Sequence, residues 1–129
     1  MKAVDTNILA RIILQDDARQ TAIAADILRH PVWISLSVWT ELGWLLFKRL
    51  KLQRDVVAEA LSTLLMMETV RVADAAGLSW AIERFRSGAD WADMVHLIAA
   101  RGAADTFVTF DAGVAPAASG APVSVETLA

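Results

Sequence analysis

The sequence predicts an α/β fold in which a mainly parallel sheet is covered by helices on both faces. Short β-rich segments alternate with longer helical segments along the chain, which is typical of parallel sheets with right-handed crossovers. No linker or internal repeat divides the 129 residues, so we expect one domain over residues 1–129. A chain of this length buries roughly two-thirds of its unfolded surface, so it can form a stable core without disulfides. Disulfides are excluded because the chain contains no cysteine.

The elements follow from apolar periodicity, capping residues and helix breakers. Pro31 ends one helix because it has no backbone N–H, and the hydroxyl of Ser37 is the expected N-cap of the next. Asp74 and Asp90 are the expected N-caps of two later helices. We expect strands at 2–4, 32–35, 70–72, 106–110 and 123–125, helices at 8–14, 18–30, 37–50, 54–67, 74–88 and 91–101, and a loop at 116–122.

Two of these helices, at 37–50 and 54–67, form a predicted helical hairpin with more apolar residues than one buried face needs. The chain is 56% hydrophobic with a mean hydropathy of +0.44, yet no apolar run reaches the ~20 residues of a membrane helix. We therefore expect an oligomer or partner interface, no membrane association and, without a secretory segment, a cytoplasmic location. The net charge of −3 lacks the basic surplus of many nucleic-acid binders, although an acidic metal site would conceal a basic surface.

Four acidic residues lie where strands end or helices begin. Asp5 and Asp111 each follow a strand directly, while Glu41 and Asp93 lie in the first turns of helices. Because the carboxyl ends of parallel strands share one edge of a sheet, we expect these acids to converge there. Clustered carboxylates favour protonation or a bound cation, and oxygen ligands without cysteine suit Mg²⁺ or Mn²⁺. Such an ion activates water and polarises a phosphoryl oxygen, which is the chemistry of phosphodiester hydrolysis.

Each acid also has a purely structural explanation. Asp5 can cap the first helix, Asp111 can begin a turn, and Asp90 with Asp93 fits an N-cap and N3 pair that favours the helix dipole. Glu41 lies among apolar residues, where a solvated acid is less expected. The joint pattern favours function more strongly than any single acid does.

Four motifs in order resemble the PIN-domain ribonucleases and, more narrowly, the VapC toxins of bacterial toxin–antitoxin pairs. The motifs are VDTNIL at 4–9, WTEL at 39–42, GADWADM at 88–94 and VTFD at 108–111. The resemblance implies a three-layer α/β/α sandwich with a central, mainly parallel sheet of four to five strands. It also implies an endoribonuclease toxin that depends on Mg²⁺ or Mn²⁺, hydrolyses transfer or ribosomal RNA through metal-activated water, binds a cognate antitoxin and forms a homodimer.

The same resemblance implies catalytic and metal-binding roles for Asp5, Glu41, Asp93 and Asp111, with Asp90 as an additional acid near the site. Many relatives carry a basic residue after the last motif, whereas this chain continues from Asp111 with Ala-Gly-Val. A contact through water is therefore an alternative to direct metal binding for Asp111.

Several polar residues are expected to support the acids. Thr6 and Asn7 can hydrogen-bond the carboxylates or orient a metal-bound water, with helix capping as the alternative. Thr109 shares a strand face with Asp111, with an ordinary sheet hydroxyl as the alternative. His96 shares a helical face with the acid three residues before it, and we expect it to be packed rather than to act as a base.

Basic residues supply candidate RNA contacts. The main cluster lies at the tip of the predicted hairpin and consists of Lys48, Arg49, Lys51 and Arg54. Such a cluster can attract RNA phosphates, with a solvated helix turn as the alternative. Arg11 is a further candidate for a phosphate contact, and Arg84 and Arg86 are candidates for a phosphate or antitoxin contact. The apolar stripes of the hairpin predict core or dimer surface, or a groove for an amphipathic antitoxin helix.

Two other functions compete with the metal nuclease. A phosphohydrolase would use Asp5 as a covalent nucleophile, but that chemistry commonly needs a second Asp two positions later, where this chain has Asn7. A non-catalytic PIN-like binding module would have lost its metals, against which the retained acids argue.

Overall fold

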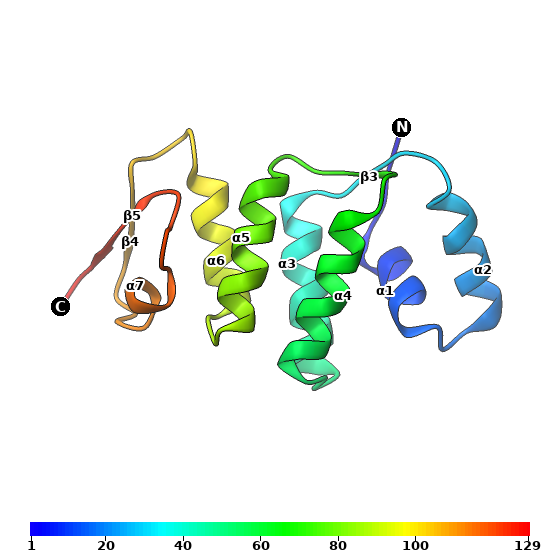
Figure 1. Cartoon of the computed structure of the whole chain (residues 1–129), viewed down its shortest axis with the longest axis horizontal. Coiled ribbons are helices and arrows are strands. Elements are labelled where there is room, and N and C mark those ends of the chain that lie inside the picture. The colour runs from blue at the N-terminus through cyan, green and yellow to red at the C-terminus, as the bar shows by residue number, and fades with distance from the viewer.

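The computed structural model describes residues 1–129 and contains five short strands, seven α-helices and one π-helical turn (Figure 1). The strands are β1 (Lys2–Ala3), β2 (Val32–Trp33), β3 (Val70–Arg71), β4 (Thr106–Thr109) and β5 (Ser124–Thr127). The helices are α1 (Thr6–Leu14), α2 (Ala18–Ile27), α3 (Leu36–Trp44), the π-helical turn η1 (Leu45–Arg49), α4 (Arg54–Met66), α5 (Ala75–Arg86), α6 (Trp91–Ala100) and α7 (Val114–Ala117).

The strands form two parallel sheets, one with the order β1-β2-β3 and the other of β4 and β5. The predicted α/β class with parallel strands is confirmed, with one correction: the strands do not share one central sheet. Strands β1, β2 and β3 are each two residues long, so they supply few ladder hydrogen bonds. Figure 1 shows β4, β5 and α7 at one end of the molecule and α1 and α2 at the other, with α3 to α6 between them.

The core lies mainly among α3 to α6, and the predicted helical hairpin is confirmed as α3, η1 and α4. Trp39, Leu42 and Leu46 from the first arm and Leu61 from the second are fully buried. Trp44, in contrast, is 51% exposed. The hairpin therefore turns one part of its apolar surface inward and leaves another part accessible.

Most of the helices begin at residues whose side chains accept hydrogen bonds from backbone N–H groups of the first turn. Asp17, Asp74 and Asp90 cap α2, α5 and α6, as their short acidic side chains favour. The prediction of Ser37 as the cap of α3 is wrong. Ser35 caps this helix because its Oγ accepts from the Val38 N–H at 3.3 Å, whereas the Ser37 hydroxyl hydrogen-bonds that same Oγ.

The C-terminal tail contains a short helix that the sequence did not predict. Residues 116–122 are rich in Ala, Pro, Ser and Gly, yet α7 reaches Ala117. Val114 and Ala118 are buried here, so their contact with the core outweighs the loop-like composition. No helix of the molecule has the length and apolar character required to cross a membrane.

Close packing fixes α6 against α3. A Cβ added at Gly43 would lie 2.2 Å from Cδ1 of Trp91, so only glycine allows this approach. The Trp91 Nε1–H also donates to the Trp39 carbonyl oxygen at 2.8 Å. Because Trp91 is the first residue of α6, these contacts hold in place the helix start that carries Asp90 and Asp93.

Candidate active site

Asp93 is the electrostatic centre of the acids that the structure brings together. It is half-buried in the first turn of α6. Burial raises the pKa of its carboxyl above the ordinary value of 3.8, the charges of Asp90 and Asp111 raise this pKa further, and His96 lowers it. Two of the predicted acids therefore disfavour the charged form of a third, which a nearby cation would offset.

Asp90 is exposed and caps α6. Its Oδ2 accepts a hydrogen bond from the Asp93 N–H at 3.0 Å, so the capping interpretation is confirmed for this residue. A capping carboxylate has a second oxygen, and in Asp90 that oxygen remains available to a ligand.

Asp111 follows β4 and begins a turn. Its Oδ1 accepts from the Gly113 N–H at 2.8 Å, and its own N–H donates to the Thr109 Oγ1 at 2.9 Å. Strand β4 reaches α6 through a stacked pair of rings, Phe107 on His96, with centroids 6.4 Å apart. This contact explains how Asp111 approaches Asp93, and it gives the exposed His96 a packing partner.

Asp5 lies at a different place, after β1 and at the start of α1. Its Oδ1 accepts from the Ile8 N–H at 3.3 Å, which makes Asp5 itself the N-cap, rather than Thr6 or Asn7. Thr6 is buried and Asn7 is exposed. A pocket of about 330 Å³ opens beside Asp5 between α1 and α2, and Arg11 lines it.

Glu41 lies in the middle of α3, the helix that packs against both α1 and α6. Its side chain is exposed, contrary to the expectation from its apolar neighbours in sequence. Those neighbours point into the core from the other face of the helix, because Trp39 and Leu42 are fully buried.

The predicted four-acid metal site is not assembled in this structure. No group of three or more His, Cys, Asp or Glu side chains lies close enough to hold a metal ion. Asp5 follows the three-stranded sheet and Asp111 the two-stranded one, so a common sheet edge does not join them. The donor chemistry of these carboxylates suits Mg²⁺ or Mn²⁺, and the ligand set stays a prediction.

The predicted basic residues have different surroundings. Lys48, Arg49 and Lys51 are exposed at the hairpin tip. Arg54 instead donates from Nη1 to the carbonyl oxygens of Phe85 and Ala89 at 2.7 and 2.9 Å, so a structural role competes with its predicted phosphate contact.

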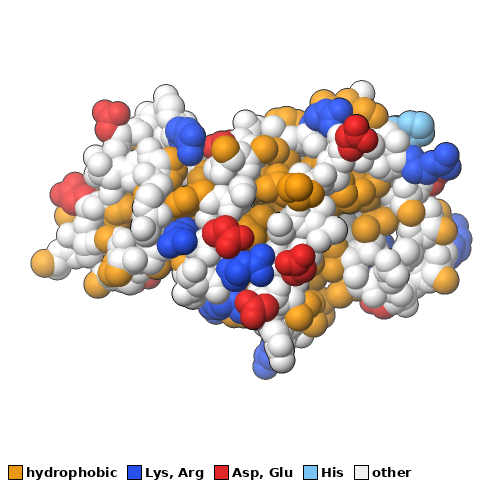
Figure 2. Space-filling model, in the orientation of Figure 1, with side chains coloured by type: hydrophobic (Ala, Val, Ile, Leu, Met, Phe, Trp, Pro, Cys, Tyr) orange, Lys and Arg blue, Asp and Glu red, His pale blue; other side chains and the backbone are white.

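Two other arginines are engaged in ion pairs. Arg11 pairs with Asp16 at 2.8 Å. Arg86 lies 3.6 Å from Glu59 and 3.5 Å from Glu83. The Arg86 pairs place acidic and basic side chains side by side over α4 and α5, as Figure 2 shows. The positive charge of both arginines is therefore partly neutralised within the chain.

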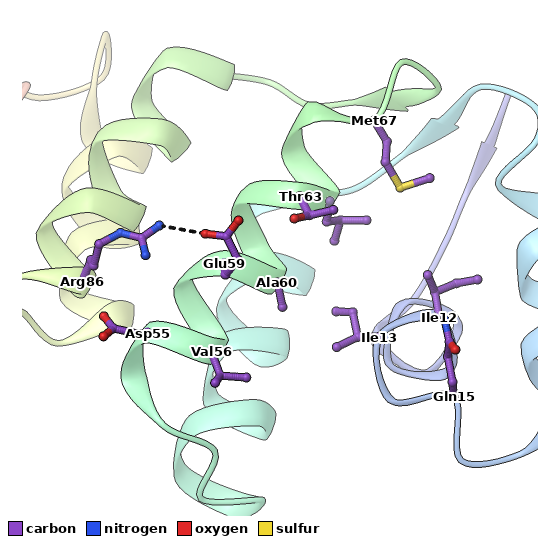
Figure 3. Close-up of a pocket in the computed structure, with 11 residues that line it drawn as sticks. Ile12, Ile13, Gln15, Asp55, Val56, Glu59, Ala60, Thr63, Met67 and Arg86 are labelled. Carbon is purple, nitrogen blue, oxygen red and sulfur yellow. Dashed lines mark ion pairs between the residues drawn. The ribbon is translucent and has the colours of Figure 1, made fainter.

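A groove with a volume of about 950 Å³ lies between α1 and α4 (Figure 3). Ile12 and Ile13 of α1 face Val56 and Ala60 of α4 across it, while Asp55, Glu59 and Arg86 line one side. The sequence showed only the surplus of apolar residues. It did not show that α1 would supply the opposite wall, because that wall depends on how two helices pack.

Comparison with known proteins gives one match. The family model described as PIN domain matches residues 2–118. No curated protein and no solved structure shows significant similarity to the chain.

Proposed function

Because the chain belongs to the PIN-domain family, we propose that it is an endoribonuclease that depends on Mg²⁺ or Mn²⁺ and serves as the toxin of a VapC-type toxin–antitoxin pair. PIN domains are generally nucleases, so family membership supports hydrolysis of phosphodiester bonds. The proposal includes a cytoplasmic location, where transfer and ribosomal RNA are found.

The observation that carries the proposal is the geometry at the start of α6, where half-buried Asp93 follows the Asp90 cap and β4 brings Asp111 toward them. Burial and neighbouring carboxylates raise the pKa of Asp93, so a nearby positive charge would stabilise its ionised form. A bound divalent ion would supply this charge and the Lewis acidity that phosphodiester hydrolysis needs. Asp5 and Glu41 belong to the proposed site through the motif resemblance.

Asp5 offers the sharpest test because its capping role and its proposed catalytic role can be separated. Asparagine caps helices about as well as aspartate, but it lacks the negative charge. We expect Asp5→Asn to keep the wild-type melting temperature and to lower metal-dependent RNA cleavage at least about 100-fold. Asp5→Ala should lose the activity and, in addition, about 1 kcal/mol of stability, since the cap at Ile8 is removed.

The assay would follow cleavage of structured RNA in Mg²⁺, Mn²⁺ or EDTA. Activity that persists in EDTA, or wild-type activity in Asp5→Asn, would contradict the metal nuclease. A phosphoryl adduct on Asp5 would instead indicate the phosphohydrolase. Mapping the 5′ ends of cellular RNA after expression of the protein would identify the substrate.

The proposed antitoxin would bind the α1–α4 groove through an amphipathic helix. In support, Ile13 and Val56 give the groove apolar walls, and the carboxylates of Asp55 and Glu59 would complement basic residues flanking such a helix. We expect Val56→Asp to weaken binding of the co-expressed antitoxin at least tenfold while RNA cleavage continues, because none of the acids of the proposed active site lines this groove. Unchanged antitoxin binding would contradict this site.

The proposed homodimer is tested by sedimentation of the toxin alone.

A further inference from the structure

A second, smaller pocket opens beside Asp90. It has a volume of about 260 Å³ and is lined by Trp44, Phe47 and Lys48 on one side and by Asp90 and Trp91 on the other. This volume lies below the roughly 300–1,000 Å³ of sites for drug-sized ligands. The pocket therefore suits a single flat ring system and is too small for a protein helix.

Trp44 is the aromatic wall that is accessible to a ligand. It is 51% exposed, whereas Trp91 is only 5% exposed and is packed into the core. The ring of Phe47 already has cationic neighbours, with the Arg54 guanidinium 4.6 Å and the Lys48 Nζ 5.3 Å from its centroid. An incoming ring would consequently stack on the Trp44 indole.

The polar groups of the pocket match those of a nucleotide. The Lys48 ammonium group is exposed and can attract a phosphate. Only Oδ2 of Asp90 accepts the capping hydrogen bond from Asp93, which leaves Oδ1 to accept an N–H of a heterocyclic base. An aromatic platform with a cation beside it is how proteins hold unstacked bases of single-stranded RNA.

The backbone of the hairpin's first arm ends at this pocket. Phe47 and Lys48 belong to η1, a single π-helical turn closed by the Leu50 N–H bonding to the Leu45 carbonyl oxygen at 2.9 Å. Such wider turns occur at the C-terminal ends of helices. Here the widened turn carries two of the residues that line the pocket.

We propose that this pocket holds one unstacked base of a single-stranded RNA segment, next to the acids around Asp93. The inference rests on the proposed endoribonuclease function and adds a substrate subsite to it. Trp44 would supply the stacking surface, Asp90 a hydrogen-bond acceptor and Lys48 a contact to the adjoining phosphate. Substrate choice would then depend on which loop can present a base in this position.

The test compares two labelled strands of equal length in EDTA, where metal-dependent cleavage does not interfere. One is a short single-stranded RNA, and the other is the same sugar–phosphate chain without bases. We expect wild-type protein to bind the RNA about tenfold more tightly than the abasic strand, measured by fluorescence anisotropy. In Trp44→Ala this preference should fall to about twofold or less, and in Trp44→Phe most of it should remain.

Val56→Ala is the matched control, since Val56 is also 51% exposed but lies in the α1–α4 groove. It should keep the full preference for the base-containing strand. Melting temperatures of all variants check that folding is intact, and Trp44→Phe keeps the test valid if Trp44→Ala is unstable.

The possible outcomes distinguish failure of the base pocket from failure of the proposed endoribonuclease function. Metal-dependent cleavage with equal binding of both strands by wild type, or an unchanged preference in Trp44→Ala, would overturn the base pocket and leave the nuclease intact. A change of oligomeric state in Trp44→Ala without a change in RNA preference would also overturn it, and would assign Trp44 to a contact between copies. Failure of wild type to bind or cleave any RNA would overturn both proposals.

Discussion

At the residue scale, single side chains around the acids combine structural and electrostatic roles. Asp5 and Asp90 both accept the backbone N–H that a helix start leaves without a partner, and both are acids of the proposed site. Asp93 differs from them because it is half-buried, so its ionisation depends on its neighbours. Capping and catalysis are therefore compatible roles for one carboxylate, since each role can use a different oxygen.

Asp93 gives a pH-dependent prediction for the metal-free protein. Its pKa in the folded protein lies above the ordinary 3.8 of the unfolded chain, so the folded state binds this proton more tightly. The associated stability is fully present below the unfolded pKa and is lost as the pH rises through the folded pKa. Asp93→Asn has no such loss, so we expect its melting temperature relative to wild type to increase as the pH is raised from about 4 to 7.

The measurement is thermal unfolding in EDTA across this range. A difference between Asp93→Asn and wild type that is independent of pH would show that Asp93 is not perturbed in the metal-free fold.

Arg54 gives a second prediction at this scale. Its guanidinium donates to two carbonyl oxygens and lies 4.6 Å from the ring centroids of both Phe47 and Phe85. We expect Arg54→Ala to lower the free energy of unfolding by about 2–4 kcal/mol, because it removes the two hydrogen bonds and the stacking on both rings. Arg54→Lys should recover little, since lysine lacks the planar fork.

Urea unfolding measures this loss, with the exposed Arg49→Ala as the control, expected within about 0.5 kcal/mol of wild type. An equally small effect of Arg54→Ala would mean that its hydrogen bonds are not formed in solution. The residue would then be available for RNA.

At the scale of the element, the position of α6 matters most, because its first turn carries two of the acids. The helix is held on one side by α3, through Gly43 and the indole of Trp91, and on another by α5. On its exposed side it meets β4 through the His96–Phe107 stack. The acids therefore sit at the start of a helix that is fixed from several directions.

Gly43→Ala tests this packing. The added methyl group would overlap the Trp91 ring, and we expect a loss of about 1–3 kcal/mol even though alanine is intrinsically the better helix residue by about 1 kcal/mol. Because the start of α6 would shift, RNA cleavage should fall as well. Ser79→Ala, on the exposed face of α5, is the control and should change neither quantity. A more stable Gly43→Ala protein would contradict the close approach.

At the scale of the whole molecule, the proposed acids are divided between two regions. Asp90 and Asp111 raise the pKa of Asp93 near the start of α6, whereas Asp5 follows the three-stranded sheet. If a divalent ion binds the folded chain through these acids, it will stabilise the fold according to its free concentration.

We therefore expect Mg²⁺ or Mn²⁺ at ten times its dissociation constant to add about 1.4 kcal/mol, seen as a rise of a few degrees in the melting temperature. Chelation with EDTA should reverse the rise. Asp93→Asn and Asp5→Asn should each reduce it if both acids contribute to one site. A rise that persists in Asp5→Asn but not in Asp93→Asn would restrict the ion to the acids around α6.

Much of this architecture was predictable because it depends on local chemistry. The five strands, the helical hairpin and the caps at Asp74 and Asp90 follow from alternation, periodicity and short polar side chains at helix starts. The error at Ser37 is a shift of two residues, because two serines flank the helix start and only the backbone geometry decides between them.

The sequence by itself determined the α/β class, the PIN-domain motifs and the acids at strand and helix ends, since these are set by residue type and spacing along the chain. The tertiary structure decided which residues from distant parts of the sequence lie close together. It divided the strands between two sheets and joined Asp111 to Asp93 through β4 and α6. It also formed the α1–α4 groove and left Trp44 exposed beside Asp90. The physical reason is that contacts between distant segments depend on how helix faces pack, and that packing is a property of the whole fold.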